Sequence, residues 1–264
     1  MIRRYGPAPY RVLFLHGGPG AAGSVGGACL ELGKICGVLE PWQSKYSVAE
    51  LTEELDGQIR DFATAPVTLI GHSWGAWLSL LYAATHPQTV SRLVWIGCPP
   101  LDESYAPLIN ARRMQNLTVQ EAKQFAKALE ILEKGPEEQK AQALKTLDAL
   151  ACRADATEPL EDDTDIPAPD EKAFAAVWPQ AAALRAKGTL LKAAQMLACP
   201  VTVIHGENDP HPPQGVTAPL TRLHISFTEI LLPRCGHTPW AEKYACEPFF
   251  RALRALLLNQ SKRN

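Results

Sequence analysis

Residues 67–75 read VTLIGHSWG, and this stretch decides the fold. Val67–Ile70 is a continuous apolar run, which is typical of a strand buried on both faces of a parallel sheet. Gly71–Gly75 interrupts the run and matches G-x-S-x-G, and the helix-like stretch Trp77–Thr85 follows. This strand–turn–helix setting is the one in which the serine of the motif acts as a nucleophile. The stretch therefore predicts Ser73 as a nucleophile on a tight turn.

The two glycines of the motif have a steric role. A serine that projects its hydroxyl from the top of a sheet needs a turn that brings strand and helix close together. The residues two positions before and after the serine must then lack a Cβ, as Gly71 and Gly75 do. The helix that follows also directs its positive end at negative charge developing beside Ser73.

The alternation of strands and helices extends to both sides of the motif. Strands that alternate with helices predict an α/β fold with a mostly parallel sheet and helices on both faces. The segments before the motif are Arg11–His16 and, more weakly, Ile35–Leu39 as strands, and Val48–Ala63 as a helix. Those after it are the strands Leu93–Ile96, Val201–His205 and Phe227–Leu232, and the helix Phe249–Leu258.

A long helical segment separates the two halves of this pattern. From about Leu101 to Leu197 the chain is helical in character, which is too long for a plain connection. We therefore expect an α/β core of residues 1–100 and 198–264, with residues 101–197 inserted as a helical cap. Within this segment, the acidic stretch Glu161–Asp165 is expected to be a solvated loop.

The composition narrows the class of protein. The 264 residues are 46% hydrophobic and 20% charged, with a net charge of −2, which is an ordinary globular balance. Nothing in it points to a nucleic-acid partner or an anionic membrane surface. No apolar run approaches the roughly 20 residues of a membrane span, and the N-terminus lacks the apolar stretch of a secretory signal. We expect a cytoplasmic protein that acts on a small molecule or short peptide; the sequence does not indicate its oligomeric state.

The cysteines indicate free thiols. There are seven, an odd number, and no C-x-x-C pair occurs. Disulfide frameworks belong to small secreted chains, and zinc sites need closely spaced ligands. We therefore expect neither disulfides nor a metal, and the proposed chemistry requires no cofactor.

A serine nucleophile needs a base, and the best candidate is His237. His237 follows the strand Phe227–Leu232, at the carboxyl end of the sheet where catalytic groups gather. His224 is the other histidine late in the chain, but it falls where a surface helix should be. The remaining histidines have structural explanations: we expect the side chain of His72 to point away from the serine, His205 and His211 to be structural, and His86 to be exposed at a helix end.

The acid that orients the base is predicted to be Asp209. In this class of nucleophile turn the chain order is serine, acid, histidine. Asp209 lies in Gly206–Pro210 (GENDP), directly after the strand Val201–His205. Two alternatives remain open: Glu207 in the same loop, and Asp102 after the strand Leu93–Ile96.

Two backbone N–H groups should stabilise the oxyanion formed by attack of Ser73. One is the N–H of Trp74, directly after the nucleophile. The other should come from the glycine-rich loop His16–Gly20, with Gly18 as first choice and Gly17 as second. Aromatic side chains could line an apolar substrate pocket; the candidates are Trp74, Trp178 and Trp240, with core packing as the alternative for each.

Five segments together resemble the α/β-hydrolase superfamily, and within it the proline iminopeptidase-like branch. They are HGGPG at 16–20, GHSWG at 71–75, YAATHPQTVSRLVWIG at 82–97, GENDP at 206–210 and CGHTPWAEKY at 235–244. The resemblance covers about residues 10–100 and 198–258 and leaves out the cap. It implies an α/β-hydrolase fold, with Ser73 as nucleophile, Asp209 as acid and His237 as base. It also implies Gly18 and Trp74 as oxyanion donors.

The sequence departs from this branch in two places. The branch usually has two further strands before the HGGPG strand, whereas only about ten residues precede it here, so the sheet is expected to be truncated at that edge. The branch also carries an Asp-x-Arg-Gly-x-Gly-x-Ser-like loop after the next strand, where this chain has Val38–Ser44 (VLEPWQS). That loop normally shapes the pocket, so the peptidase specificity does not transfer directly.

The sequence therefore predicts a serine hydrolase with a Ser-His-Asp triad, acting on a small ester or on a peptide with a free N-terminus. The same scaffold could instead serve as a small-molecule receptor or a lyase, since fold does not fix function. A non-catalytic interaction protein is a third hypothesis, but it would not require three aligned catalytic residues.

Overall fold

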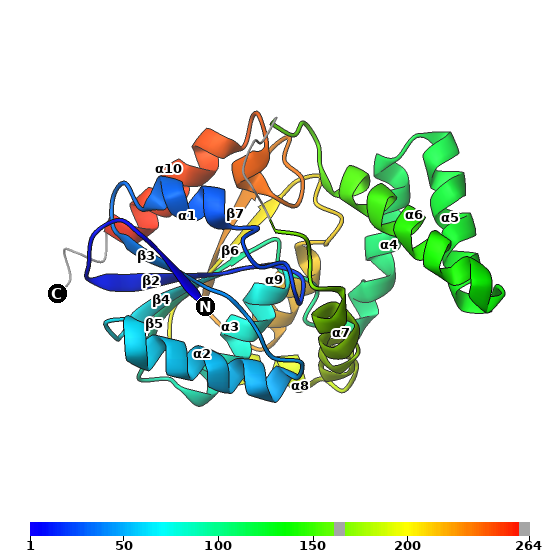
Figure 1. The fold of residues 1–264 in the computed structure, drawn as a ribbon. Coiled ribbons are helices and arrows are strands. Elements are labelled where there is room, and N and C mark those ends of the chain that lie inside the picture. Colours follow the sequence, from blue (N-terminus) through cyan, green and yellow to red (C-terminus); the bar gives the residue numbers. More distant parts are fainter. Residues whose placement is uncertain (161–166, 259–264) are drawn as a thin grey trace.

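The computed structural model describes residues 1–160 and 167–258, and its centre is a seven-stranded sheet with helices on both faces (Figure 1). The strand order is β1-β3-β2-β4-β5-β6-β7. β1 runs antiparallel to β3, and the other neighbours pair in parallel. The predicted mostly parallel α/β sheet is therefore confirmed. The strands are β1 (Ile2–Tyr5), β2 (Tyr10–Leu15), β3 (Gly37–Pro41), β4 (Val67–His72), β5 (Val90–Ile96), β6 (Val201–Gly206) and β7 (Phe227–Leu232).

Side chains of the central strands alternate between two apolar layers. Leu13 and Leu15 of β2 face the layer beneath α2 and α3, whereas Val12 and Phe14 face the layer beneath α1 and α10. Because both faces are covered, the strands read as continuous apolar runs and not as polar–apolar alternations. The helices beside the sheet are α1 (Gly26–Leu32), α2 (Val48–Phe62), α3 (Trp74–Thr85), α9 (Gln214–Arg222) and α10 (Cys246–Leu258).

Strand β1 is a feature that the sequence did not reveal. Its residues IRRY place two consecutive arginines on a half-buried edge strand, so no apolar run marks it. Arg3 lies over the Trp42 ring, and the Tyr5 hydroxyl donates a hydrogen bond to buried Glu40 at 2.7 Å. One strand therefore precedes β2, where the resemblance implies two and the sequence indicated none.

Among the described residues, six helical segments lie between β5 and β6. Helices α4 to α6 project from the sheet and pack around their own small cluster of Leu117, Phe125 and Ala154 (Figure 1). Helices α7 and α8 instead bury Val177 and Leu190 in the same core as α3. The division at residues 101 and 197 stays a prediction. The segments are η1 (Glu103–Tyr105), α4 (Ala106–Asn116), α5 (Val119–Lys134), α6 (Glu137–Asp155), α7 (Glu171–Ala186) and α8 (Thr189–Gln195).

Three further expectations concern the cysteines, membrane-spanning helices and the acidic stretch of the insertion. All seven cysteines are free, as predicted. Among the described helices, none is both long and apolar enough to cross a bilayer. The acidic stretch Glu161–Asp165, expected to be a solvated loop, lies outside the described residues.

Candidate active site

Ser73 lies on a strained turn between β4 and α3. Its backbone has φ +51° and ψ −121°, a region that non-glycine residues rarely adopt. The turn is attached to the end of β5, because the Ser73 N–H donates a hydrogen bond to the Ile96 carbonyl at 2.9 Å. Helix α3 begins at Trp74, three residues earlier than predicted, and Ser73 remains partly exposed among buried neighbours. Strain kept at one accessible serine is typical of a functional position.

The two motif glycines are required by close backbone contacts. A Cβ on Gly71 would lie 2.4 Å from the Gly75 carbonyl oxygen, and one on Gly75 would lie 2.4 Å from the carbonyl oxygen of Leu15. Neither oxygen can move without displacing a strand or the helix. The steric reason predicted for these glycines therefore holds in the structure.

Gly75→Ala is expected to lower the free energy of unfolding by about 1–3 kcal/mol, as overpacking in a tight interior does. The matched control is Gly57→Ala in the middle of α2, where the nearest atom to a new Cβ is 3.8 Å away on Arg60. That change is expected to stabilise the protein by about 0.5–1 kcal/mol, because alanine favours the helix. Urea unfolding of both variants measures the difference; equal effects would contradict the close packing of the turn.

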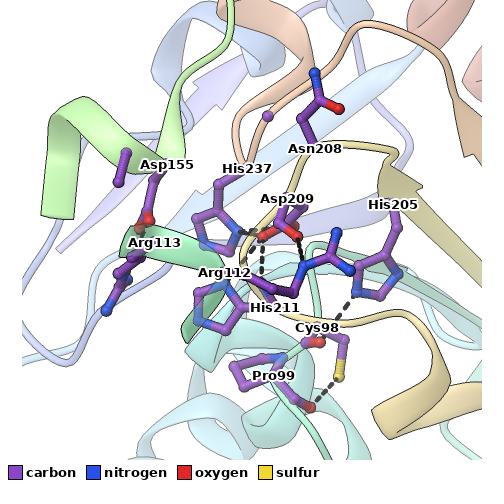
Figure 2. A network of polar contacts seen from close by, with 12 residues as sticks. Cys98, Pro99, Arg112, Arg113, Asp155, His205, Asn208, Asp209, His211 and His237 are labelled. Atoms are coloured by element: carbon purple, nitrogen blue, oxygen red, sulfur yellow. Dashed lines mark hydrogen bonds and ion pairs between the residues drawn. The ribbon is translucent and has the colours of Figure 1, made fainter. Parts of the chain in front are cut away.

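The candidate acid and base meet at the carboxyl ends of β6 and β7. His237 Nδ1 lies 3.0 Å from Asp209 Oδ2 and 3.1 Å from Oδ1, and both residues are buried (Figure 2). Gly206 lets the two loops approach, because a Cβ there would lie 2.2 Å from the carbonyl oxygens of Cys235 and Gly236. With Nδ1 facing the carboxylate, the proton of neutral His237 resides on Nδ1. Nε2 is then free to accept a proton.

The charges of this pair stabilise each other. Burial alone would raise the pKa of Asp209, but the positive charge of His237 and hydrogen bonds from two histidines hold that pKa well below its usual range. Burial alone would lower the pKa of His237, but the Asp209 carboxylate raises it above the ordinary value. The geometry therefore keeps Asp209 ionised beside a histidine with increased basicity.

The two alternative acids lie elsewhere. Glu207 is exposed. Asp102 forms an ion pair with Arg222 at 2.7 Å and accepts a hydrogen bond from the Ser104 hydroxyl. Since these bonds occupy Asp102, the carboxylate that contacts His237 is Asp209. His224 is exposed at the end of α9, as expected from the sequence.

Neighbours of Ser73 make direct contact with the His237 loop. His72 Nε2 lies 3.0 Å from the His237 carbonyl oxygen, and a Cβ on Gly97 would lie 2.8 Å from His237 Nδ1. Gly97 directly follows Ile96, which holds the Ser73 N–H. No hydrogen bond joins the Ser73 hydroxyl to His237 within the described chain. Such bonds commonly tighten only when substrate binds.

His72 has a larger part than the sequence indicated. Its ring packs against the rings of His237 and Trp240, at centroid distances of 4.6 and 4.8 Å. Burial holds the pKa of His72 well below its usual range, so the ring is neutral and donates from Nε2 to the His237 carbonyl. His72 thus anchors the loop that carries His237 to the turn that carries Ser73. A single sequence does not reveal this contact, because the two residues are 165 positions apart.

Two of the candidate oxyanion donors, Gly17 and Trp74, lie beside Ser73. A Cβ on Gly17 would be 3.1 Å from Ser73 Cβ, so the glycine-rich loop touches the nucleophile. Gly18 has φ +43°, which favours glycine. As the first residue of α3, Trp74 has an N–H without a partner inside the helix. Gly17 and the first residue of α3 therefore lie next to Ser73, and the oxyanion roles of Gly18 and Trp74 stay predictions.

Gln43 connects the start of α3 with the glycine-rich loop His16–Gly20, and the sequence reasoning missed it. Its Oε1 accepts a hydrogen bond from the Trp74 indole at 2.7 Å, and its backbone N–H donates to His16 Nε2 at 3.3 Å. Burial lowers the pKa of His16 to about 4, so the ring is neutral and can accept. Gln43 lies in the segment that departs from the iminopeptidase pattern, so no motif marked it.

The helical insertion contacts the two loops that carry Asp209 and His237. Arg112 of α4 donates to the Asp209 carbonyl at 3.1 Å and the Glu207 carbonyl at 3.0 Å (Figure 2). Arg113 forms two hydrogen bonds with the Asp155 carboxylate at the end of α6, at 2.6 and 2.7 Å. The Asp155 carbonyl in turn accepts from the His237 N–H at 2.7 Å. These contacts depend on tertiary structure and have no local sequence signal.

Arg113→Ala is expected to lower the free energy of unfolding by about 1.5–3 kcal/mol, since hydrogen bonds to charged groups contribute that much when largely shielded. Arg222→Ala is the matched control: it removes a similar ion pair, with Asp102, that is more exposed. The free energy of unfolding of Arg222→Ala is expected to fall by less than about 1 kcal/mol. Thermal or urea unfolding compares the two variants. A loss for Arg222→Ala as large as that for Arg113→Ala would contradict this account.

The two tryptophans predicted to contact substrate lie in different surroundings. Trp240 is only 8% exposed and its ring packs edge-on against those of Phe14 and His72, so core packing accounts for its position and a substrate contact stays a prediction. Trp178 of α7 is partly buried and stacks between Trp77 and Phe174. A substrate contact for Trp178 stays a prediction.

One cluster of possible metal-binding atoms occurs among the described residues. The ligand atoms of Asp209, His211 and His237 lie within 4.8 Å of one another. The hydrogen bonds from both imidazoles to Asp209 account for this spacing. We therefore assign no metal to it.

Sequence and structure comparisons agree on the class of this protein. The chain matches the α/β hydrolase fold family over residues 39–244 and belongs to that family. No curated protein matches the sequence at a significant level.

Solved structures with the same fold cover nearly the whole chain. VinJ aligns with 98% of this chain and 94% of its own, with TM-score 0.68 and 19% identity. A putative lipase from Acinetobacter baumannii AYE aligns with 100% and 88%, with TM-score 0.63 and 17% identity. A thermophilic esterase from Thermogutta terrifontis aligns with 98% and 93%, with TM-score 0.62 and 17% identity. At these identities, the likeness establishes the fold.

Proposed function

We propose that the protein is a serine hydrolase with Ser73 as nucleophile, His237 as base and Asp209 as orienting acid. The observation that carries the proposal is the buried Asp209–His237 hydrogen bond, in contact with the strained turn that presents Ser73. A receptor would need neither the strained serine nor a base with a raised pKa. The strained backbone at Ser73 costs free energy, and shifted pKa values cluster at functional sites.

The reaction proceeds through an acyl-enzyme. His237 Nε2 accepts the Ser73 hydroxyl proton as Oγ attacks the substrate carbonyl carbon. The N–H groups of Trp74 and Gly18 stabilise the oxyanion. As the tetrahedral intermediate collapses, His237 gives the proton to the leaving oxygen or nitrogen. A water molecule, deprotonated by the same imidazole, then releases the acid and restores Ser73.

We favour small esters as substrates. The fold is shared with proteins named as a putative lipase and a thermophilic esterase, which supports ester chemistry. The resemblance to the proline iminopeptidase-like branch supports peptides with a free N-terminus as the second class. The departure at Val38–Ser44, where Gln43 connects to the donor segments, favours the ester over the peptide.

Burst kinetics test this proposal. With p-nitrophenyl esters of short acids, an acyl-enzyme mechanism predicts a rapid release of about one nitrophenolate per enzyme, followed by slower turnover. Prolyl p-nitroanilide tests the peptidase class in parallel. Turnover of the anilide alone would replace the esterase assignment with a peptidase. Absence of turnover and of a burst with both substrates would overturn the hydrolase proposal.

The pH dependence of catalysis follows from His237. Only the neutral imidazole accepts a proton, and its pKa lies above the ordinary value of 6.5. We expect kcat/KM to be full at alkaline pH and to fall by about tenfold per pH unit below the pKa of His237. Initial rates from pH 5 to pH 9 measure this profile. A midpoint below pH 6.5 would contradict the raised basicity of His237.

A further inference from the structure

A second histidine shares the carboxylate of the acid. His211 Nδ1 lies 3.1 Å from Asp209 Oδ1, the oxygen that His237 Nδ1 also approaches at 3.1 Å (Figure 2). The His211 backbone N–H also donates to Oδ1, at 2.9 Å. The His211 ring stacks on that of His237, with centroids 4.3 Å apart and planes 28° from parallel. The sequence suggested only a structural role for His211, yet it lies in direct contact with both acid and base.

The stacked imidazoles cannot both be charged. Two positive rings at this separation, shielded from water, would repel strongly. Burial and the charge of His237 lower the pKa of His211, while the pKa of His237 is raised. The proton taken up during catalysis therefore resides on His237, and His211 stays neutral. With its Nδ1 facing Asp209, neutral His211 carries its proton there and donates it.

The other titratable groups around His211 and His237 keep the same charge while His237 gains and loses its proton. The buried rings of His72 and His205 are neutral, since burial lowers the pKa of each. The Arg113–Asp155 ion pair is internally balanced. Burial raises the pKa of the Cys98 thiol well above its usual range, so the thiol is uncharged. His211 is thus the neutral donor that shares the Asp209 charge with His237.

We propose that His211 is a positioning residue: its Nδ1–H holds the Asp209 carboxylate and sets the pH at which His237 accepts a proton. A second donor on the shared Oδ1 takes up part of the negative charge that would otherwise act on His237. Without that donor the carboxylate attracts the His237 proton more strongly, and the base becomes protonated at higher pH. This inference rests on the proposed hydrolase function.

Two substitutions separate this role from simple packing. His211→Phe keeps a flat ring for stacking on His237 but removes the Nδ1 donor. His211→Asn keeps a donor nearly where Nδ1 lies, because the asparagine amide nitrogen occupies a similar position, but removes the ring. Both retain the backbone N–H bond to Asp209. His224→Asn, at an exposed histidine after α9, is the control.

The pH profile of kcat/KM is the first measurement. His211→Phe is expected to move the acid limb to higher pH by roughly one unit, the scale on which a charge-bearing hydrogen bond shifts a pKa. His211→Asn is expected to restore the limb to within a few tenths of a unit of the wild-type midpoint. The control should leave it unchanged. An unshifted limb in His211→Phe would overturn the proposal, even if that variant lost thermal stability.

An NMR titration keeps the outcome independent of catalysis. With isotope-labelled histidine, the midpoint of the His237 ring resonances should rise in His211→Phe and return in His211→Asn. If wild-type protein gives the acyl burst while His237 titrates identically in all variants, the positioning role fails and the hydrolase function stands. If no burst occurs but the His237 midpoint shifts as expected, the hydrolase function fails and the coupling stands.

Discussion

Replacing Ser73 by alanine is expected to lower kcat for ester hydrolysis by about 10⁴–10⁶-fold, the loss seen when a triad nucleophile is removed. The reason is chemical: no other hydroxyl lies on the strained turn in contact with the His237 loop. Folding should be intact, because the Ser73 bond that holds the turn comes from its backbone N–H. Steady-state rates with a short acyl p-nitrophenyl ester measure the loss.

The control for this change is Ser226→Ala, at an exposed serine before β7. We expect it to retain wild-type kcat. A Ser73→Ala protein that kept more than a tenth of wild-type turnover, with a normal unfolding midpoint, would move the nucleophile to another residue.

Replacing Asp209 by asparagine is expected to lower kcat by about 10⁴-fold, as the same change in other triads does. The amide has nearly the shape of the carboxylate, so the two loops should still meet. However, its –NH₂ group can face His237 Nδ1, which then becomes an acceptor, and the ring proton shifts to Nε2. The imidazole in that form cannot accept the Ser73 proton.

The two rival acids supply controls for this prediction. Asp102→Asn removes a charge that pairs with Arg222 near the surface, and Glu207→Gln changes an exposed side chain. Both are expected to leave kcat within about twofold of wild type, since surface changes of this kind have small effects. A larger loss in either variant than in Asp209→Asn would show that the acid was wrongly assigned.

The parts of this account that the sequence predicted are those with local causes. Buried strands leave continuous apolar runs, and the turn at Ser73 requires Gly71 and Gly75, so both are visible in one sequence. The chain order of serine, acid and histidine, together with their places in loops directly after strands, then favoured Asp209 and His237. Strand β1 escaped notice because an edge strand with two adjacent arginines lacks an apolar run.

The parts that the sequence did not predict depend on contacts between distant segments. His72 holds the His237 loop across 165 positions, and Arg112 of the insertion reaches Asp209 across 97. His211 is only two residues from Asp209, yet nothing in the sequence indicates that its ring turns back to stack on His237. For Trp240 the sequence left two roles open, because a tryptophan near such a loop is equally compatible with a pocket wall and with the core.

The central claim is that the Ser73 hydroxyl is the group that attacks. The most direct test is covalent labelling with an alkyl fluorophosphonate, followed by mass spectrometry of the intact protein and its peptides. We predict one adduct per chain, on the peptide containing Ser73, and no adduct in Ser73→Ala; labelling of His237→Asn should be much slower. An adduct on a different residue, or an unlabelled wild-type protein that is correctly folded, would contradict the account.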